Sequence, residues 1–277
     1  MNDLIIEWSP NVKAISIGPI AIHWYSLMFL LAFYIGFKIM KKIYVKENKD
    51  IALLDPFLVH MVVGTIVGAR LGEVFFYNWD YFQNNLLEIF LPFKIDSSGW
   101  EFIGFRGLSS HGATVGIIIS IILYKIRYKY DSVLWIFDRI VIAVALGGMF
   151  VRIGNFFNSE IVGKYTNSDF GVIFLNRSEV LPRHPAQLYE AFGYLLLFIL
   201  LVFIYNKTKL SRKKGFVFGL FLSILFGIRF IVEYVKESQG GIEEALGIFS
   251  TGQWLSIPFI LIGLSLMTLG LKNKYNG

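Results

Sequence analysis

Long apolar runs separated by short basic stretches are the main pattern of the chain. A helix needs about 20 largely apolar residues to cross the hydrocarbon of a bilayer. Runs close to this length are expected to form spans at residues 20–39, 57–77, 112–126, 134–150, 190–205, 215–234 and 254–271. The pattern therefore predicts an all-α integral membrane protein with seven transmembrane helices.

The charges between these spans predict their orientation, because cytoplasmic loops carry an excess of Lys and Arg. Alternate junctions are the basic ones, at residues 38–49, 125–129 and 207–214, and residues 272–274 fall on the same side. We therefore expect the N-terminus outside and the C-terminus in the cytoplasm. Asp3 and Glu7 stand where a signal peptide would be basic, so the first span is expected to be retained.

Two outside segments, residues 78–110 and 156–187, are long for connections in a helical bundle. They are expected to form a small periplasmic or extracellular head, and the stretch "WDYFQNNLLEIFLPF" has the amphipathic character of an interfacial helix. Without a linker or a repeat, residues 1–277 are predicted to be a single polytopic membrane domain. Gly64, Gly68 and Gly72 stand four apart, which predicts a face where two helices pack closely.

Composition narrows the class of protein further. Only 17% of the 277 residues are charged and 55% are hydrophobic, whereas about a quarter of a soluble domain is charged. The net charge of +6 reflects loop topology, so nucleic-acid binding is not expected. The absence of cysteine excludes disulfides and a cysteine nucleophile. The sequence also lacks phosphate-loop and metal-binding motifs, so no metal and no cofactor are expected.

Charged residues inside the predicted spans are the first candidates for chemistry. A charge in hydrocarbon normally faces the bundle interior and has a partner. The expected pairs are Arg70 with Glu73, Asp138 with Arg139, Arg152 with Glu160, and Arg229 with Glu233. An internal ion pair with no further role explains any single pair equally well, but several together predict a polar chamber. Two arginines favour an anionic ligand such as a phospholipid headgroup, because a guanidinium matches phosphate oxygens.

Two stretches near predicted span ends carry further polar residues. In "VRIGNFFNSEIVG", Gly154 and Gly163 would let the backbone approach a ligand. His111, in "RGLSSHGATVG", is either a capping residue at the interface or a base at the membrane surface. His184 precedes a proline and is expected to do structural work at the start of the fifth span.

Several segments, in this order, resemble the prolipoprotein diacylglyceryl transferases of bacterial plasma membranes. They are "SIGPIAIHWYSL", "GARLGEVFFYN", "SSHGATVG", "VRIGNFFNSEIVG", "LPRHPAQLYE", "FGIRFIVEYVKE" and "STGQWLSIP". The family signature G-R-x-G-N-F-x-N-x-E-x-x-G is matched at every fixed position except the first, where Val151 stands. The chain also departs from the family at Leu225 or a neighbouring position, where a tyrosine is expected, and at Glu73, where an aromatic residue is common.

The resemblance implies a reaction: the diacylglyceryl group of phosphatidylglycerol is transferred to the lipobox cysteine of a preprolipoprotein signal peptide. The products are a thioether and glycerol 1-phosphate. The resemblance also implies seven helices around a lipid pocket open to the membrane lipids. It places the protein in the bacterial plasma membrane, with the active site near the outer leaflet.

Site residues follow from the same resemblance. Arg152 and Arg229 match phosphate-handling positions, and His111 matches an essential histidine, which either deprotonates the thiol or orders the site. Tyr25, Asn155 and Gly163 match other positions required for activity and are expected to help bind phosphatidylglycerol. The supporting residues are expected to be Glu160, Glu233 and Asp138, together with the intramembrane Arg70.

Two other functions fit part of the pattern. A transporter or channel for an anion or lipid would explain intramembrane arginines without catalysis. The sequence lacks the matched pair of interrupted helices that usually marks such a transport site. A membrane scaffold that recognises signal peptides without modifying them is the third interpretation.

Overall fold

The computed structural model describes residues 4–17, 20–91, 93–96, 99–102, 109–130, 132–237 and 247–272. Its long helices are α1 (Trp24–Lys46), α2 (Leu54–Phe76), α5 (Ser110–Arg127), α6 (Val133–Phe157), α7 (Ala186–Lys207), α8 (Phe216–Val232) and α10 (Thr251–Lys272). Four of the described helical stretches are long and apolar enough to cross a membrane, namely Ile51–Phe76, Val133–Phe157, Ala186–Lys207 and Thr251–Lys272. The protein is therefore mostly helical, with the composition of an integral membrane protein.

The helix ends differ from the predicted span ends for identifiable reasons. The first helix begins at Trp24 because Ile20–His23 forms strand β3, which pairs with β2 (Lys13–Ile17). The third begins at Ser110 because the Ser109 side chain accepts the Gly112 N–H at 3.3 Å and so caps the helix. The fourth continues to Phe157, so Arg152 and Asn155 lie on α6 and not in the loop after it.

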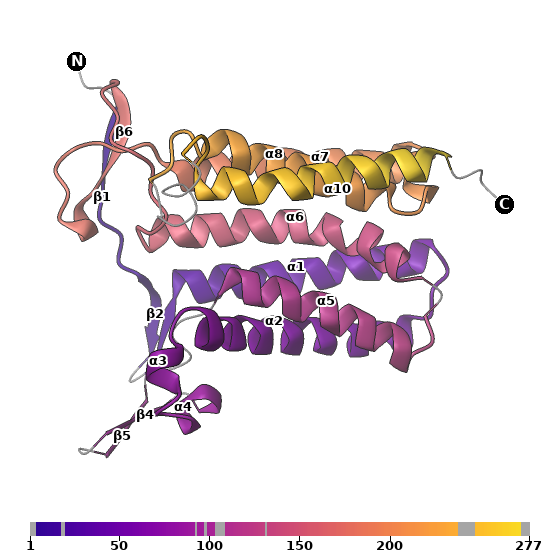
Figure 1. Ribbon diagram of the computed structural model, residues 1–277, viewed down its shortest axis with the longest axis horizontal. Helices are drawn as coiled ribbons and strands as arrows, with labels where there is room; N and C mark the ends of the chain where they lie inside the picture. The colour runs from indigo at the N-terminus through magenta and orange to yellow at the C-terminus, as the bar shows by residue number, and fades with distance from the viewer. Residues whose placement is uncertain are drawn as a thin grey trace. The chain divides into compact units, whose positions relative to one another are not determined.

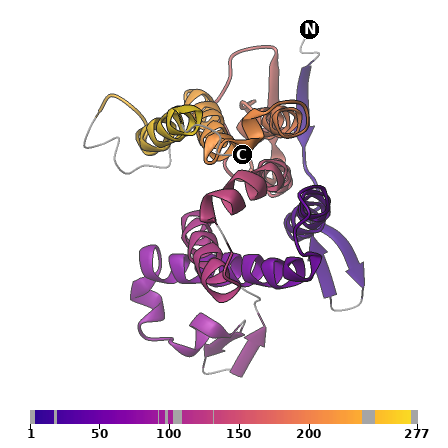
Figure 2. The ribbon, with the colours of Figure 1, turned by 90° about the vertical axis from the view of Figure 1, so that its right-hand side faces the viewer.

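The chain forms two compact units. Unit 1 comprises Met1–Ile43 and Phe137–Gly277, and unit 2 comprises Tyr44–Ile136. In unit 1, α7 packs on α8 and α8 packs on α10, while α6 runs beside them (Figure 1). Figure 2 looks along these helices and shows α8 and α10 end-on. The α8–α10 contact is close, and only glycine fits there, because a Cβ on Gly219 would lie 2.6 Å from the Gly263 carbonyl oxygen.

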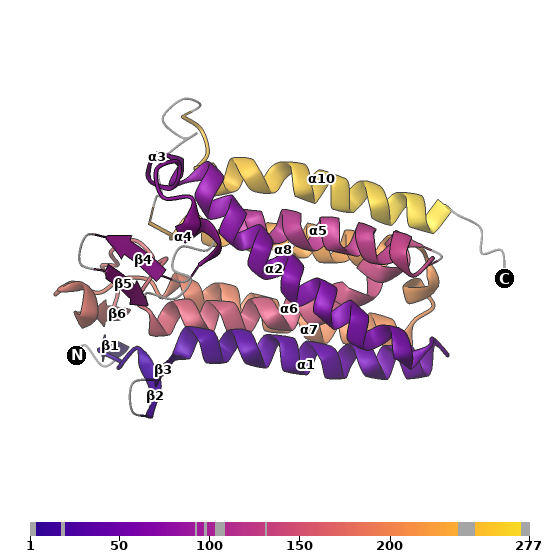
Figure 3. The ribbon, with the colours of Figure 1, turned by 90° about the horizontal axis from the view of Figure 1, so that it is seen from below.

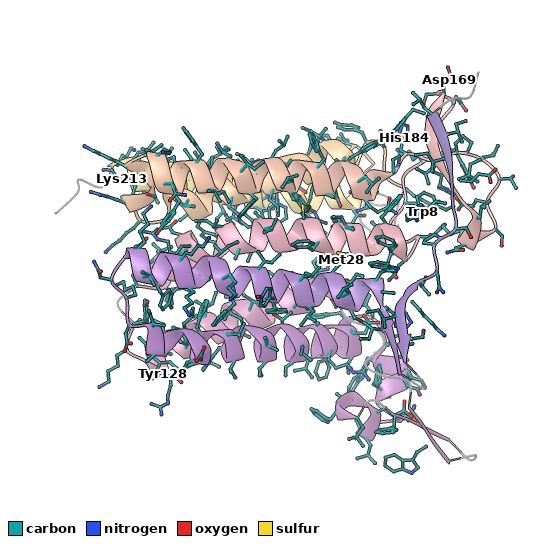
Figure 4. All side chains as sticks on the ribbon, turned by 180° about the vertical axis from the view of Figure 1, so that it is seen from behind. Trp8, Met28, Tyr128, Asp169, His184 and Lys213 are labelled. Atoms are coloured by element: carbon teal, nitrogen blue, oxygen red, sulfur yellow. The ribbon has the colours of Figure 1, made fainter. Side chains whose placement is uncertain are left out.

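A small apolar core closes one end of unit 1. Strand β1 (Leu4–Trp8) pairs in parallel with β6 (Phe170–Phe174). Trp8 packs on the buried side chains of this core, which are Phe156, Val162, Val172 and Phe174. The Trp8 indole N–H also donates to the Phe156 carbonyl at 3.0 Å. Figure 4 shows Trp8 and His184 at this end of the unit and Lys213 at the other.

Unit 2 is built on a contact between α2 and α5, which cross in Figure 3. Glycines of one helix meet glycines of the other, and the residues involved are Gly64, Gly68, Gly72, Gly112 and Gly116. A Cβ on Gly68 would lie 2.5 Å from the Gly112 carbonyl oxygen and 2.7 Å from the Gly116 Cα. The predicted packing face is confirmed, and its partner is α5.

The rest of unit 2 consists of short elements, some of which pack on α2. They are the 3-10 turn η1 (Ile51–Leu53), α3 (Trp79–Phe82), α4 (Leu87–Phe90) and the antiparallel pair β4 (Phe93–Asp96) and β5 (Gly99–Phe102). Arg70 of α2 donates to the carbonyls of Glu88 at 2.5 Å and Ile89 at 3.1 Å. Its guanidinium carbon also lies 4.7 Å from the centre of the Phe82 ring. These contacts make Arg70 the residue that anchors α3 and α4.

The close α2–α5 contact can be tested by a substitution that adds a single methyl group to a glycine. Gly68→Ala is expected to destabilise the protein by roughly 1–3 kcal/mol, because the added Cβ meets backbone atoms that cannot move aside. Gly227→Ala is the matched control, since a Cβ on this α8 glycine meets nothing within 4 Å. Thermal unfolding in detergent measures both variants. If Gly68→Ala unfolds at the wild-type temperature, the close packing is wrong.

Candidate active site

The polar side chains of unit 1 gather around Arg152, near the end of α6. Its Nε lies 2.5 Å from Oε2 of Glu190 in α7. The Arg152 side chain is 12% exposed and that of Glu190 is 1% exposed, so this is a buried ion pair between two apolar helices. Arg152 Nη1 also donates to the Asn155 Oδ1 at 3.1 Å.

Asn155 connects this ion pair to the loop after α6. Its Nδ2 donates to Oε1 of Glu160 at 2.7 Å, and its carbonyl accepts the Glu160 N–H at 3.1 Å. The expected Arg152–Glu160 pair is therefore replaced by an Arg152–Glu190 pair, with Asn155 between Arg152 and Glu160. Sequence reasoning missed Glu190 because it lies on a different helix. The available signal was an acid at the start of an apolar run, three residues after Gln187.

The loop that carries Glu160 has an unusual backbone. Ser159 and Ile161, on either side of it, have φ values of 54° and 57°. Non-glycine residues in this left-handed region cost about 1–3 kcal/mol each, and the cost is highest for β-branched ones. The conformation persists because Asn155 holds Glu160 and because Val162 is buried in the apolar core beside Phe156. The carboxylate of Glu160 is thus fixed in place by its surroundings.

Tyr25 in the first turn of α1 borders the same network. A Cβ on Gly154 would lie 2.9 Å from the Tyr25 Cδ2, so only glycine allows α1 and α6 to approach this closely. Tyr25 interacts electrostatically with both Glu160 and Arg152. The structure therefore brings together Tyr25, Arg152, Asn155 and Glu160.

Arg229 of α8 differs from Arg152 in its partners. Among the described residues, no carboxylate lies within 4.0 Å of its guanidinium, and its Cζ is 5.9 Å from the Phe226 ring centre. The expected pair with Glu233 is not formed, because Glu233 Oε2 lies 3.4 Å from Lys236 Nζ. The buried Tyr194 interacts electrostatically with both Arg229 and Arg152. The Tyr194 phenol is thus a common neighbour of the two arginines.

Asp138 has a different place in unit 1. Its carboxylate accepts the N–H groups of Gly215 at 2.7 Å and Phe218 at 2.9 Å. A buried carboxylate on these groups satisfies the first turn of α8 and favours its dipole. Asp138 therefore lies at the opposite end of α8 from Arg229, and its described contacts stabilise the helix.

Gly163, the last residue of the motif, lies where three segments of the chain meet. Its N–H donates to the His184 carbonyl at 3.0 Å, and a Cβ would lie 2.8 Å from the Val235 carbonyl oxygen. The Gly163 carbonyl accepts from Arg183 Nη1 at 2.9 Å. The described contacts of Gly163 are thus hydrogen bonds and close packing of its backbone. His184 contacts the Tyr189 hydroxyl at 3.2 Å through Nδ1, just before α7 begins.

An ionic cluster in unit 1 holds Arg183, and with it Gly163. Arg183 pairs with Glu179 at 2.6 Å and with Glu237 at 3.1 Å, and Arg177 pairs with Glu179 at 2.9 Å. Partial burial alone would raise the pKa of the Glu179 carboxyl. Hydrogen bonds and attraction from the two arginines outweigh burial and hold that pKa below its ordinary value of 4.5. The cluster is therefore strongest when Glu179 is ionised.

His111 belongs to unit 2. It is exposed in the first turn of α5, and its Nδ1 lies 3.3 Å from the hydroxyl of Tyr77, the residue that follows α2. Imidazole is the side chain that most often acts as a general base. The contact with a phenol is also compatible with an ordering role, so both interpretations of His111 stand.

The arrangement in unit 1 suits an anion with oxygen acceptors. Guanidinium groups carry only hydrogen-bond donors, in a planar fork that matches phosphate. Arg152 is oriented by a carboxylate and an amide, whereas Arg229 lacks a carboxylate partner among the described residues. In the part of the chain that the structure describes, no group of three His, Cys, Asp or Glu side chains could hold a metal ion.

Comparison with known proteins decides the family. Residues 12–269 match the family described as "Prolipoprotein diacylglyceryl transferase". The chain belongs to the prolipoprotein diacylglyceryl transferase family. A Tolumonas auensis protein named phosphatidylglycerol–prolipoprotein diacylglyceryl transferase is 42% identical over 98% of this chain and 99% of its own length. Proteins of the same name from Bacteroides fragilis (38% identical, 99% of each chain) and Chloroherpeton thalassium (37% identical, 96% and 95%) also match end to end.

The family resemblance drawn from the motifs is thus confirmed, and the chain is a transferase. The structure gives the signature of this transferase family a physical basis. Arg152 forms the buried ion pair, Asn155 connects it to Glu160, and Gly154 and Gly163 allow close approach. Val151, at the deviating position, is half-buried on α6, and no contact explains it.

Acid should weaken the ionic cluster around Arg183. A carboxyl with a depressed folded pKa contributes stability above its unfolded pKa and loses it as the pH falls through the folded value. The expected loss for Glu179 therefore begins near pH 4.5 and continues below it. Unfolding temperatures measured from about pH 7 to about pH 3 should fall more steeply for wild type than for Glu179→Gln. Parallel curves would show that Glu179 does not contribute.

Proposed function

We propose that this transferase moves the diacylglyceryl group of phosphatidylglycerol to the lipobox cysteine of a preprolipoprotein signal peptide. The names of its full-length relatives, which include both substrates, support this reaction. The structural observation that carries the proposal is the buried Arg152 network, which places a fixed guanidinium among apolar helices. An anionic lipid headgroup is the ligand that such a site suits best.

The proposed setting is the bacterial plasma membrane, crossed seven times, with the N-terminus outside. Basic residues support this topology, since they lie in the last turns of α1, α5, α7 and α10 but not of α2 or α6. The last turn of α8 carries Arg229, which is assigned to the proposed site. Such an alternation is typical of helices whose cytoplasmic ends carry Lys and Arg. In this topology the C-terminal end of α6, which has no basic residue in its last turn, lies outside. Arg152 lies near that end, so the proposed reaction takes place near the outer leaflet.

In the proposed site the two arginines have different tasks. Arg229, without a carboxylate partner among the described residues, supplies the charge that attracts the phosphate. Arg152 supplies N–H donors in a direction fixed by Glu190 and Asn155. Donors that are already oriented stabilise a leaving anion without rearranging during the reaction. Tyr25 and Glu160 are the other polar side chains of the proposed phosphate site.

The chemical step replaces one bond with another. The cysteine sulfur forms a bond to the terminal glyceryl carbon, and the bond from that carbon to the phosphate oxygen breaks. Glycerol 1-phosphate leaves with the electron pair. The thiol, with a pKa of about 8.5, must first lose its proton, and His111 is the proposed base. The scaffold and transporter alternatives involve no such covalent change.

A mass-spectrometric assay tests this function. Purified protein is incubated with phosphatidylglycerol and a lipobox peptide, and the peptide is expected to gain the mass of a diacylglyceryl group. Arg229→Ala should lower the rate about 100-fold or more, because the variant loses a cation that stabilises the charge developing on the departing phosphate. Arg212→Ala, which removes an exposed arginine before α8, serves as the control. An unmodified peptide with wild type would refute the reaction.

The same assay separates the two interpretations of His111. If the histidine is the base, His111→Gln loses rate and also loses the pH dependence near neutrality. If it orders the site, the variant loses rate but keeps the wild-type pH profile. Full rate with an unchanged profile would exclude both roles.

A further inference from the structure

Two side chains at the start of α7 are each fixed at one polar atom and open at the other. Gln187 donates through Nε2 to the Glu160 carbonyl at 2.7 Å, and Glu190 holds Arg152 Nε through Oε2 at 2.5 Å. The other oxygen of each, Gln187 Oε1 and Glu190 Oε1, accepts no hydrogen bond from the described residues. Both residues are buried, with 0% and 1% exposure.

An unpaired acceptor that is also buried is costly, so it indicates a partner that arrives with a ligand or with water. Residues three apart on a helix share a face, which places these two oxygens on the same side of α7. A glutamine oxygen and an ionised carboxylate oxygen can only accept. The missing partner must therefore donate hydrogen bonds, and at Glu190 it does so beside the Arg152 guanidinium.

The charges around these oxygens limit what the donor can be. The Glu190 charge is already balanced by Arg152, so an ammonium group at Oε1 would be a second cation beside that arginine. Like charges this close repel, which disfavours an amine headgroup. Neutral hydroxyl groups donate without this penalty. The site therefore suits a phosphate ester whose alcohol part carries hydroxyls.

We propose that Gln187 and Glu190 are specificity-determining residues, which accept hydrogen bonds from the two hydroxyl groups of the phosphatidylglycerol headgroup. This inference rests on the proposed transfer from that lipid. The hydroxyls stand on the two carbons that follow the phosphate-bearing carbon. A phosphate held by arginine therefore brings them close to the Glu190 carboxylate.

Phosphatidylpropanol is the probe that isolates these hydroxyls. It keeps the acyl chains, the charge and a headgroup of equal carbon length, but it has no hydroxyl. Wild type should prefer phosphatidylglycerol by at least about 100-fold in kcat/KM, because a buried acceptor left unpaired strongly disfavours the analogue. Equal use of both lipids would overturn the inference and leave the transferase function standing. That result is also expected if only water fills the position. Transfer from neither lipid would refute the function itself.

Glu190→Gln tests the residues directly. The variant keeps an oxygen for Arg152 but puts an NH₂ group where the open oxygen was. Both rates should fall, because the variant loses the charge that orients Arg152, but transfer from phosphatidylglycerol should fall about tenfold more than transfer from phosphatidylpropanol. A merely structural residue would lower both rates equally, and that outcome would overturn the assignment.

Gln187→Met is the second variant, since it keeps the length of the side chain and removes the oxygen. It tests the same loss of lipid preference if Glu190→Gln fails to fold. Glu179→Gln makes the same chemical change in the ionic cluster around Arg183 and should leave the preference unchanged. A wild-type preference ratio in Gln187→Met would remove Gln187 from the proposal.

Discussion

The ion pair between Arg152 and Glu190 is the interaction on which the site depends. Both charges are nearly out of contact with water, on helices that are otherwise apolar. A charge in such surroundings is tolerated only with a close partner, and removal of one partner typically costs about 3–5 kcal/mol. The pair therefore ties α6 to α7 and fixes the direction of the Arg152 guanidinium.

Two other features of the site accompany this pair. Because Glu190 takes the Nε edge of Arg152, Glu160 is bound through Asn155 instead, on a loop held in a left-handed backbone. Lys236 pairs with Glu233, and no described carboxylate lies within 4.0 Å of the Arg229 guanidinium. Arg152 is thus held in a fixed orientation, whereas Arg229 has no described carboxylate to compete with a bound anion. This combination suits a site that binds a phosphate and stabilises its departure.

The sequence predicted what depends on local pattern. Apolar runs located the helices, glycines four apart predicted the packing face of α2, and the motif order identified the family. The motif residues Arg152, Asn155 and Glu160 do lie together, because α6 continues through the first two and the loop after it returns to Asn155.

Partners that come from other parts of the chain could not be predicted. The spacing of Arg229 and Glu233 suggests a helical pair, but a bridge between Lys236 and Gly163 brings the lysine to Glu233 instead. Asp138 interacts electrostatically with Arg139, as its position suggests, but no pattern in the sequence indicated that its carboxylate also caps α8. Strand β3 looked like the start of the first helix, because its apolar residues continue directly into the apolar run of α1. Each of these outcomes depends on tertiary contacts that outweigh local spacing.

A structure determined with phosphatidylglycerol bound would test the central claim most directly. We expect the phosphate within about 3.2 Å of guanidinium nitrogens of Arg229 and Arg152, with the Arg152–Glu190 pair intact. A headgroup bound away from both arginines, with the Arg152 network unchanged, would contradict the account.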